Sequence, residues 1–330
     1  MRKFVALIAG ILLLQGSVAG QAPAPAPAPA ANAVAATVNG QPIPEVAVQR
    51  ALRAVPPDKQ AEARPEILGF LIETALLDQH LVAVKVNVDA NDVQARLVEV
   101  RGLMEKQKLD YKKVLQDMLM TEEEFGSHVA AELRWEKFIE SQVSDKALRD
   151  LFDQTPEMFN GAMAKARHVL LTPPAGNAQA LEQARQQLLA LRKQIEDEVA
   201  RGLAKLPATA DPLAREKERI RLTEEVFAAV AKAKSECPSK SEGGDVGAFP
   251  RFGAMVEPFA KAAFALRPYQ MSDPVVTQFG VHLILVTDKK PGKPDLKFEE
   301  VKDDVKEVFA LRLRESLCND LKTRAKITMK

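Results

Sequence analysis

Residues 237–266 read CPSKSEGGDVGAFPRFGAMVEPFAKAAFAL, a glycine-rich stretch followed by one rich in alanine and phenylalanine. The glycines within residues 243–247 indicate tight turns, because glycine adopts backbone conformations that other residues avoid. Residues 259–266 are typical of a short helix. The apolar run at residues 282–286 predicts a strand. The stretch therefore predicts turns, a helix and a strand within about fifty residues.

A second β-like run and a long helical segment precede this stretch. Residues 166–171 read ARHVLL and are followed by Thr172-Pro173-Pro174, which predicts a strand that ends at the prolines. The next segment is amphipathic, with apolar residues at helical spacing: Leu181, Ala184, Leu188, Leu191 and Ile195. Residues 202–222 contain prolines among charges and predict an insertion or a helical extension. A short helix is predicted just before Cys237.

The region from residue 38 to residue 160 is predicted to be mostly helical. Asn39-Gly40 lies between short β-forming runs and predicts a hairpin. Thr121 and Glu124 have the spacing of a capping box, which marks the start of a helix. Helices are predicted over residues 61–84 and 89–107, after Thr121, and from Ser144 to Phe152. This region contains no recognisable chemical motif.

A last long helix is predicted after residues 291–294, which read PGKP. Its apolar stripe steps by four residues: Val301, Val305, Phe309, Leu313, Leu317 and Leu321. Such a stripe needs a partner, and the N-terminal helices are the obvious one. We therefore expect the first and last segments to form one domain, with the intervening block as an insert.

Length and charge exclude some classes of function. The chain has 330 residues, enough for two domains. Its 46 basic and 45 acidic side chains nearly cancel, so there is no electrostatic case for nucleic acid as the partner. The aromatic content of 5% suits long amphipathic helices better than an all-β fold.

The N-terminus has the pattern of a signal peptide. Arg2 and Lys3 precede an apolar run at residues 4–14, and Val18-Ala19-Gly20 offers small residues at a cleavage site. Residues 22–30 alternate alanine and proline, which favours an extended spacer. We expect export to the periplasm or outside the cell, with cleavage near Gly20. The alternative is an uncleaved segment that tethers the protein to a membrane.

The chain has two cysteines, Cys237 and Cys318. In an oxidising compartment two cysteines could form one disulfide. We expect both to stay unpaired, because Cys237 belongs to the insert and Cys318 to the closing helix of the other domain.

Six elements in a fixed order resemble the parvulin family of peptidyl-prolyl cis/trans isomerases. They are His168 in an Ala-Arg-His-Val-Leu strand, Cys237-Pro238-Ser239, Gly243 to Phe249, Met255 with Pro258-Phe259, Ala263 to Leu266, and Pro274-Val275 followed by Thr277 to His282. Six ordered elements are far more specific than one motif. The resemblance covers residues 165–290. It departs from the family in a longer stretch between His168 and Cys237 and in one extra residue at Phe252-Gly253.

The resemblance implies a small antiparallel sheet flanked by helices, with the site on its open face. It implies a proline pocket lined by Met255 and Phe259, with Val246 and Phe279 nearby. It implies that four polar residues surround the rotating amide: His168, Cys237, Thr277 and His282. Rotation must break amide resonance against a barrier of roughly 18–20 kcal/mol. A low-dielectric socket disfavours the planar, dipolar amide more than the twisted one, so no metal, cofactor or covalent step is needed.

Each of these residues also has a structural interpretation. His168 and His282 could form a hydrogen-bonded pair that shapes the sheet without transferring a proton. Cys237 could be a small buried hydrophobe. Met255 and Phe259 could be ordinary core residues. Outside the motif, Cys318, His80 and His128 are expected to serve packing or the surface.

These observations predict an α+β protein in which a parvulin domain is inserted into a mostly helical chaperone-like domain. The segments are a signal peptide at 1–20, a linker at 21–36, an N-terminal helical segment at 37–160, the parvulin domain at 165–290, and a C-terminal helix at 295–330 that packs on the N-terminal segment. Residues 38–160 and 297–324 resemble, by pattern and order, the flanking segments of SurA-like and PrsA-like exported chaperones.

Three functions remain open at this point. The first is a prolyl isomerase that acts on unfolded or newly exported polypeptides containing Xaa-Pro bonds, with holdase activity. The second is a chaperone whose parvulin-like domain only binds extended chain. The third is a Cys-His hydrolase, which would need a partnered base and an oxyanion hole. Nothing around Cys237 carries the signature of such a hydrolase.

Overall fold

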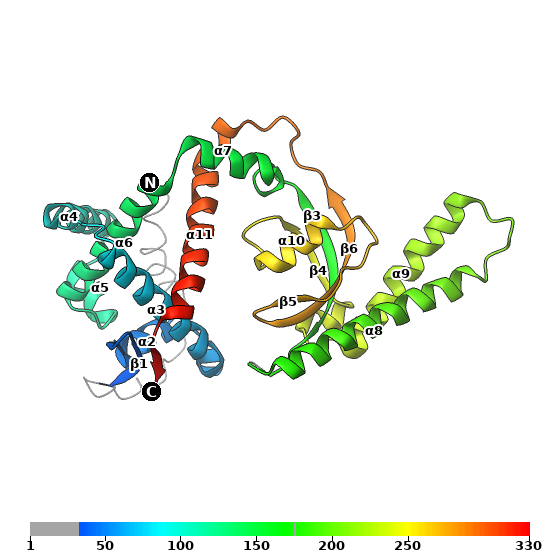
Figure 1. Cartoon of the computed structure of the whole chain (residues 1–330), viewed down its shortest axis with the longest axis horizontal. Coiled ribbons are helices and arrows are strands. Elements are labelled where there is room, and N and C mark those ends of the chain that lie inside the picture. The colour runs from blue at the N-terminus through cyan, green and yellow to red at the C-terminus, as the bar shows by residue number, and fades with distance from the viewer. Residues whose placement is uncertain (1–32, 175) are drawn as a thin grey trace. The chain divides into compact units, whose positions relative to one another are not determined.

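The computed structural model describes residues 33–174 and 176–330, and these form two compact units (Figure 1). The terminal unit contains the described residues up to Ser144 together with Lys306–Lys330. The central unit is Asp145–Val305. The predicted α+β class is therefore confirmed, with the chain's two ends in one unit and its middle in the other.

The terminal unit holds a three-stranded antiparallel sheet in the order β2-β1-β7. β1 is Val34–Val38, β2 is Gln41–Pro44 and β7 is Ile327–Met329. Asn39 and Gly40 have φ values of 52° and 85°, which a two-residue hairpin turn requires. The linker predicted to reach residue 36 ends earlier, because Ala35 and Ala36 are buried in β1. The C-terminal strand β7 was not predicted.

The helices of the terminal unit follow the apolar periodicity of the sequence. They are α2 (Glu45–Leu52), the 3-10 turn η2 (Pro57–Lys59), α3 (Gln60–Ala83), α4 (Ala90–Lys106), α5 (Tyr111–Asp117), α6 (Glu122–Gln142) and the part of α11 (Phe298–Arg324) from Lys306 onward. The capping box at Thr121 is present, with both reciprocal hydrogen bonds to Glu124. The short helix α5 was not foreseen.

Residues from the two ends of the chain share one hydrophobic core. Leu68, Ile72 and Leu76 of α3 pack with β1, and Leu321 and Ile327 join them from the C-terminal segment. A second core lies among α4, α5 and α6 and includes Leu97, Val100, Met104, Phe125 and Val129. The C-terminal segment is thus part of the terminal unit's core.

The central unit is built on a four-stranded antiparallel sheet in the order β4-β3-β6-β5. The strands are β3 (Met163–Leu171), β4 (Asp245–Pro250), β5 (Val275–Thr277) and β6 (Gly280–Lys290). Because side chains alternate along a strand, the two faces of β3 and β6 carry different residues. Val169, Leu283 and Leu285 pack with α8 (Ala178–Leu203) and α9 (Pro212–Lys234).

The opposite face of this sheet carries the even-numbered residues. Ala164, Ala166, Ile284 and Val286 form a core with side chains from β4 and from α10 (Glu257–Ala265), namely Phe249, Phe259 and Ala263. His168 and His282 have the same parity and therefore belong to this face. The register of the two central strands pairs Leu170 with His282 and His168 with Ile284.

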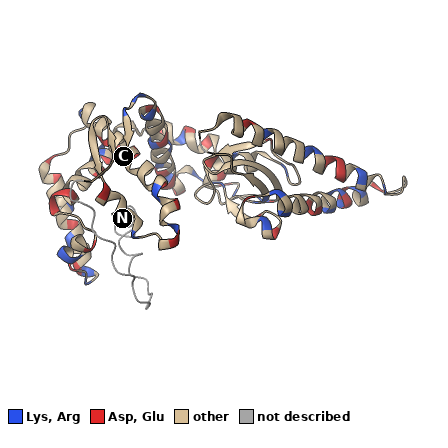
Figure 2. Ribbon diagram, turned by 90° about the horizontal axis from the view of Figure 1, so that it is seen from below, with Lys and Arg blue, Asp and Glu red and all other residues tan. Residues whose placement is uncertain are grey.

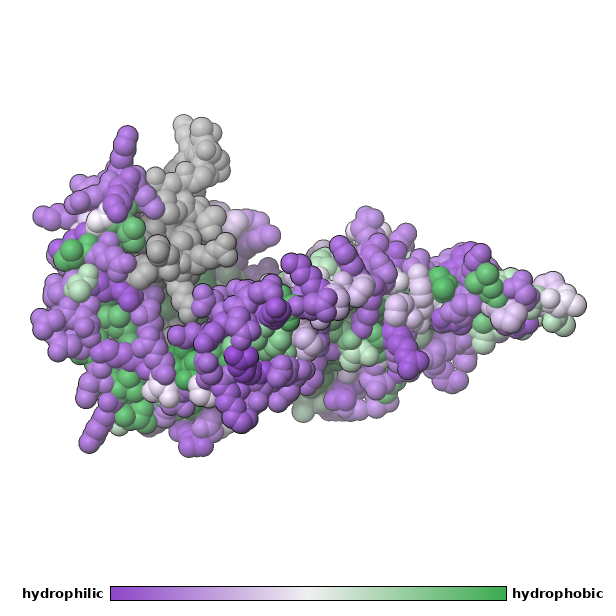
Figure 3. All heavy atoms as spheres, turned by 90° about the horizontal axis from the view of Figure 1, so that it is seen from above, coloured by the Kyte–Doolittle hydropathy of each residue, from purple (hydrophilic) through white to green (hydrophobic). Residues whose placement is uncertain are grey.

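The predicted insertion at residues 202–222 is the distal half of a helical hairpin. α8 continues to Leu203 and α9 begins at Pro212, so the short helix expected before Cys237 is the end of a much longer one. A Cβ on Gly202 would lie 2.6 Å from Leu222, so the two helices approach closely there. Charges of both signs alternate along the hairpin (Figure 2), and hydrophobic residues show near its far end (Figure 3).

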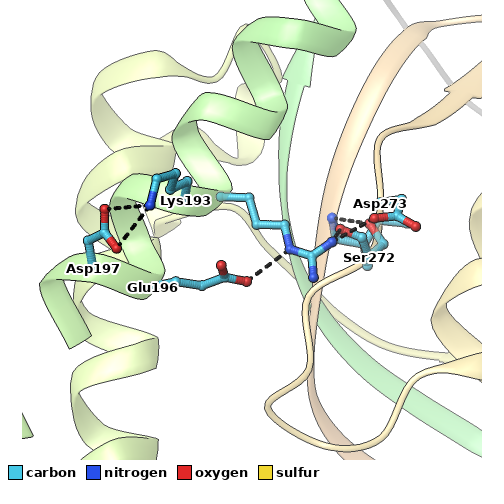
Figure 4. A network of polar contacts seen from close by, with 7 residues as sticks. Lys193, Glu196, Asp197, Ser272 and Asp273 are labelled. Atoms are coloured by element: carbon cyan, nitrogen blue, oxygen red, sulfur yellow. Dashed lines mark hydrogen bonds and ion pairs between the residues drawn. The ribbon is translucent and has the colours of Figure 1, made fainter. Parts of the chain in front are cut away.

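Arg192 of α8 forms hydrogen bonds and an ion pair with the segment that precedes β5 (Figure 4). Its guanidinium donates to Glu196 Oε1 at 3.0 Å, to Asp273 Oδ1 at 2.6 Å and to the Ser272 carbonyl at 3.4 Å. Ser272 is buried, and its hydroxyl accepts from the backbone N–H of Ile284 in β6. This contact links the outer helix to the strand that carries His282.

The central unit is wider than the 165–290 segment expected from the sequence. α7 (Asp145–Gln154) and the 3-10 turn η3 (Pro156–Met158) precede β3, and α7 packs with the start of α11. The rings of Phe152 and Phe298 lie 6.0 Å apart, and Arg149 pairs with Glu299 at 2.7 Å. These contacts attach both connecting segments to the central unit and move its boundaries outward.

The predicted signal peptide and most of the predicted linker lie outside the described residues. Within the part that the structure describes, no helix is long and apolar enough to cross a membrane. Cys237 and Cys318 are both free thiols, as predicted.

The core shared by the chain ends gives a test of the terminal unit. Replacing Ile327 with Ala should lower the free energy of unfolding by about 1–2 kcal/mol, because a partly buried side chain leaves the core around α3. Trp135 is the only tryptophan of the chain and lies in α6, so its fluorescence in a urea titration follows this unit alone. Met329, in the same strand, is 59% exposed, and Met329→Ala is the matched control. Equal effects of both changes would contradict a role for β7 in the core.

Candidate functional site

Two buried histidines face each other on the central strands of the sheet. His168 Nδ1 lies 3.0 Å from His282 Nδ1, and the imidazole rings are nearly parallel, with centroids 5.3 Å apart and an interplanar angle of 14°. His168 is 5% exposed and His282 is 4% exposed. The antiparallel register of β3 and β6 brings them together although they are 114 residues apart in the chain.

A hydroxyl group stands at each end of this pair. His168 Nε2 lies 3.1 Å from Ser239 Oγ, and His282 Nε2 lies 2.8 Å from Thr277 Oγ1. Thr277 Oγ1 also accepts from the backbone N–H of Phe279 at 3.1 Å. The result is a continuous polar row, Ser239–His168–His282–Thr277, which we call the histidine row.

Burial keeps both histidines uncharged. It lowers the pKa of His168 to about 4, and burial together with the neighbouring His168 lowers the pKa of His282 to about 4. A hydrogen bond between the Nδ1 atoms of two neutral imidazoles requires one Nδ1 to donate and the other to accept. The two rings are therefore opposite tautomers. The row therefore has a direction, in which one terminal hydroxyl donates to an imidazole and the other accepts.

Phe259 closes the apolar side of the site. Its ring meets both imidazoles edge to face, with centroids 5.6 Å from His168 and 5.4 Å from His282 and interplanar angles of 84° and 82°. Phe259 is 3% exposed and belongs to the core between the sheet and α10. Val246 and Met255 are partly buried against the same core.

Two glycines bring Ser239 to the histidine row. Ser239 lies in the 3-10 turn η4 (Pro238–Glu242), which ends at Gly243 with φ of 66°. Gly244 has φ of 77°, and a Cβ there would lie 2.3 Å from the carbonyl oxygen of His168. The backbone N–H of His168 donates to the Gly244 carbonyl at 2.9 Å. Only glycine permits so close an approach, which explains the Gly-Gly pair of the motif.

Cys237 lies at the edge of this arrangement. It is the residue before η4, it is half-buried, and its backbone N–H donates to Ser235 Oγ at 3.3 Å. Each imidazole has both ring nitrogens engaged within the histidine row. The hydroxyl that contacts His168 belongs to Ser239, two residues after Cys237.

Phe279 does not belong to the core that contains Phe259. It is 53% exposed and lines a separate pocket of about 420 Å³, beside Pro173, Leu181 and Val276. No charged side chain is among the residues that line this pocket. Thr277 borders it as well, so the pocket adjoins one end of the histidine row.

The geometry joins some of the predicted site residues and separates others. His282 contacts His168, Thr277 and Phe259, and Phe259 also contacts His168, whereas Cys237 and Phe279 lie at the periphery. Ser239 was missed although it stands in the Cys-Pro-Ser motif, since sequence alone does not show which polar residue of a turn faces a strand. Among the described residues no group of three or more His, Cys, Asp or Glu could hold a metal ion.

Comparisons with family models match two parts of the chain. The model of the PPIC-type PPIase domain matches residues 202–288. The model of the SurA-like N-terminal domain matches residues 3–139. The first match contains Ser239, Phe259, Thr277 and His282, and it begins after the strand that carries His168.

Several relatives are similar over part or most of the chain. Foldase protein PrsA 3 of Bacillus cereus is 28% identical over 261 residues, which are 78% of this chain and 72% of that protein. Foldase protein PrsA of Bacillus subtilis is 45% identical over 83 residues, which are 25% of this chain and 28% of that protein.

Among solved structures, the peptidylprolyl isomerase PrsA from Bacillus anthracis is 23% identical, with a TM-score of 0.45, covering 77% of this chain and 96% of that one. The sequence matches confirm the predicted resemblance to the parvulin family and to SurA-like chaperones. Residues 202–288 match the PPIC-type PPIase domain and residues 3–139 match the SurA-like N-terminal domain, and these matches support a parvulin-type peptidyl-prolyl isomerase domain within a SurA-like framework.

Proposed function

We propose that the chain catalyses rotation about Xaa-Pro bonds in unfolded, exported polypeptides and holds those polypeptides against aggregation. The observation that carries the proposal is the juxtaposition of an apolar wall, Phe259, with two buried neutral imidazoles. This is a low-dielectric surface edged by uncharged hydrogen-bonding groups. The foldase names of the relatives agree with it.

The isomerisation needs an environment that favours the twisted amide over the planar one. Twisting removes resonance, and with it much of the amide dipole, so an apolar surround raises the energy of the ground state relative to the transition state. In our proposal Val246, Met255 and Phe259 receive the proline ring. An X–Pro bond already has nearly balanced isomers, so catalysis needs no energy source.

The proposed roles of the histidines follow from their burial. At 4–5% exposure they are positioning residues: they hold the hydroxyls of Ser239 and Thr277 in fixed orientations. Those hydroxyls, together with half-buried Cys237, are proposed to border the rotating amide. A formal charge on an imidazole would strengthen the planar, dipolar amide, so neutrality serves the reaction.

The geometry does not favour the Cys-His hydrolase alternative. A thiol nucleophile needs a base within hydrogen-bond reach. The four ring nitrogens of the two histidines are engaged by each other and by the hydroxyls of Ser239 and Thr277. We therefore propose a non-covalent reaction, with Cys237 as a neutral neighbour of the amide.

The holdase part of the proposal rests on the terminal unit. Its exposed apolar side chains include Phe70 (59%), Val82 (53%), Val84 (50%), Val98 (64%) and Leu311 (47%). Hydrophobic residues interrupt the hydrophilic surface of this unit (Figure 3). Exposed apolar surface of this kind suits weak binding of extended apolar chain. The same surface supports the second candidate, a chaperone without catalytic activity, if the central unit proves inactive.

Export remains a proposal based on the N-terminal sequence. We propose cleavage near Gly20 and release into the periplasm or an equivalent exported compartment. The membrane-tethered form applies only if the segment stays uncleaved. Phe279 and its adjoining pocket are proposed to contact the polypeptide next to the proline.

The proline pocket is tested by replacing Met255 with Ala. The change removes one apolar wall without opening the buried core around Phe259, so kcat/KM for a proline peptide should fall about tenfold. Cis/trans exchange measured by NMR gives the rate directly. Met271 is also partly buried but packs on the opposite face of the sheet, so Met271→Ala is the matched control. An equal fall of kcat/KM in the two variants would contradict a proline pocket at Met255.

The neutral histidines predict an unusual pH dependence. Ordinary histidine titrates near pH 6.5, whereas burial lowers the pKa of His168 and His282 to about 4. A lowered pKa means that the neutral form persists as the pH falls through 6.5 and is lost only near 4. We therefore expect kcat/KM to stay flat between about pH 6 and pH 8 and to decline only below about pH 5.

The pH profile is best measured by NMR exchange, because a coupling protease would add its own titration. Far-UV circular dichroism at each pH separates loss of activity from unfolding. The unfolded chain takes up protons between about pH 6.5 and 4 while the folded site does not, so stability falls as the pH is lowered across this range. An inflection in kcat/KM near 6.5 would contradict the neutral pair.

The division of labour is tested by removing the central unit. Replacing Asp145–Val305 with a flexible linker should leave the terminal unit folded, because both of its cores are made of its own residues. The variant should suppress light scattering by an unfolded client and show no isomerase activity. Trp135 emission like that of the full chain establishes that it is folded.

Within this variant, Phe70→Ser should weaken protection, whereas Glu66→Ser on the same helix should not. Both residues are exposed, so neither change disturbs the core. A folded variant that fails to protect the client would remove the holdase part of the proposal and leave the isomerase part standing.

A further inference from the structure

The loop between β4 and α10 carries Met255 and is bracketed by an ion pair. Arg251 directly follows β4, and Glu257 is the first residue of α10. The loop between them, residues 252–256, contains the extra residue by which the sequence departs from the parvulin pattern. The ends of an enlarged loop are therefore joined by one side-chain contact.

The contact between Arg251 and Glu257 is bidentate. Nη1 donates to Glu257 Oε2 at 2.7 Å, and Nη2 donates to Oε1 at 2.7 Å. Two parallel hydrogen bonds between planar groups fix orientation as well as distance. Arg251 is 4% exposed, so its charge is withdrawn from water and depends on this partner.

Glu257 lies in the sequence between the two residues that are proposed to form the walls of the proline pocket. Met255 stands two residues before Glu257, and Phe259 stands two residues after it. Val256, the residue before α10, supplies no side-chain hydrogen bond to cap the helix. A carboxylate in the first turn also favours the helix N-terminus. Glu257 thus fixes the start of α10 while Arg251 ties that start to the end of β4.

The loop itself is weakly packed at its middle. Gly253 and Ala254 are exposed, and a Cβ on Gly253, which has φ of 89°, would meet no atom within 4 Å. Met255 is only partly buried. A loop of this kind has several conformations within reach unless its ends are held at a fixed separation.

We propose that Arg251 and Glu257 are positioning residues for isomerisation: their ion pair sets the place of Met255 relative to Phe259 and so shapes the proline pocket. The inference rests on the proposed isomerase function and adds to it a pair outside the histidine row. Substrate need not touch either residue. The pair acts by selecting one loop conformation, which is a form of preorganisation.

The test compares single and double substitutions in the full chain. Glu257→Gln keeps the size of the side chain but loses its charge, and Arg251→Lys keeps the charge but lacks the planar fork. We expect KM for a proline peptide to rise about tenfold in Glu257→Gln and by a smaller factor in Arg251→Lys, with kcat changed less than about threefold. NMR exchange at varied peptide concentration separates KM from kcat.

A double variant distinguishes positioning from a purely structural role. Arg251→Met/Glu257→Met removes both charges, and an apolar pair of similar volume often preserves stability. We expect thermal unfolding close to that of the unaltered chain, with KM still raised, because methionine side chains do not fix the loop. Recovery of KM together with stability would overturn the proposal.

Two further measurements keep the outcome interpretable. Methyl-labelled methionine should show a shifted or broadened Met255 signal in Glu257→Gln and an unchanged Met271 signal, a readout that needs no activity. Glu45→Gln breaks the matched bidentate pair with Arg64 in the terminal unit, whose bonds are 2.6 and 2.7 Å, and should leave KM unaltered. An unchanged Met255 signal in Glu257→Gln would overturn the proposal. Absence of isomerase activity in the unaltered chain would instead refute the proposed function.

Discussion

The burial of two uncharged imidazoles across adjacent strands is the constraint on which the central unit depends. Each imidazole has two ring nitrogens that must be satisfied, because an unpaired polar atom in the core is costly. The pair satisfies one nitrogen of each ring internally and needs a hydroxyl at either end. One hydroxyl comes from Ser239 in the turn η4 and the other from Thr277 in β5, so the pair connects η4 and β5 to the two central strands.

Several local features follow from this constraint. The register of β3 against β6 cannot slip by one residue, since a slip would place the two imidazoles on opposite faces of the sheet. Gly244 must lack a side chain, because a Cβ there would collide with the carbonyl oxygen of His168. The backbone N–H of His168 also donates to the Gly244 carbonyl, just after the turn η4 that carries Ser239. Phe259 then covers the rings with its edge and excludes water. The low pKa of both histidines is a consequence of this packing.

The sequence was informative where residues repeat a period or stand in an ordered motif. The β-like runs at residues 166–171 and 282–286 and the helical stripes predicted the fold class, and the motif identified His168, His282, Thr277 and Phe259. The sequence did not identify Ser239, because it does not show which way a side chain points in an irregular segment. Ser239 and Cys237 are two residues apart in one turn, and only the path set by Gly243 and Gly244 decides which of them reaches His168.

Domain boundaries were harder to predict for a different reason. The parvulin resemblance ends where its motif ends, whereas the central unit ends where α7 meets Phe298. Strand β7 has only three residues, too few for a period to be seen, and it is a strand because β1 offers it an edge. Both the boundary of the central unit and the formation of β7 depend on contacts with residues far away in the chain. The local sequence pattern does not reveal such contacts.

An isomerase of unfolded chains must combine a fixed reaction environment with tolerance for varied neighbours of the proline. In the proposed function the histidine row and Phe259 supply the fixed part, because every ring nitrogen of the row has a hydrogen-bond partner. The tolerant part is proposed to be Phe279, which is exposed, and the adjoining pocket, whose lining residues carry no charge. Met255 lies between these extremes on a loop that is held only at its ends. The ion pair of Arg251 with Glu257 joins the ends of this loop. We therefore expect that a change in the geometry of the pair affects binding of the proline ring more than it affects the stability of the fold.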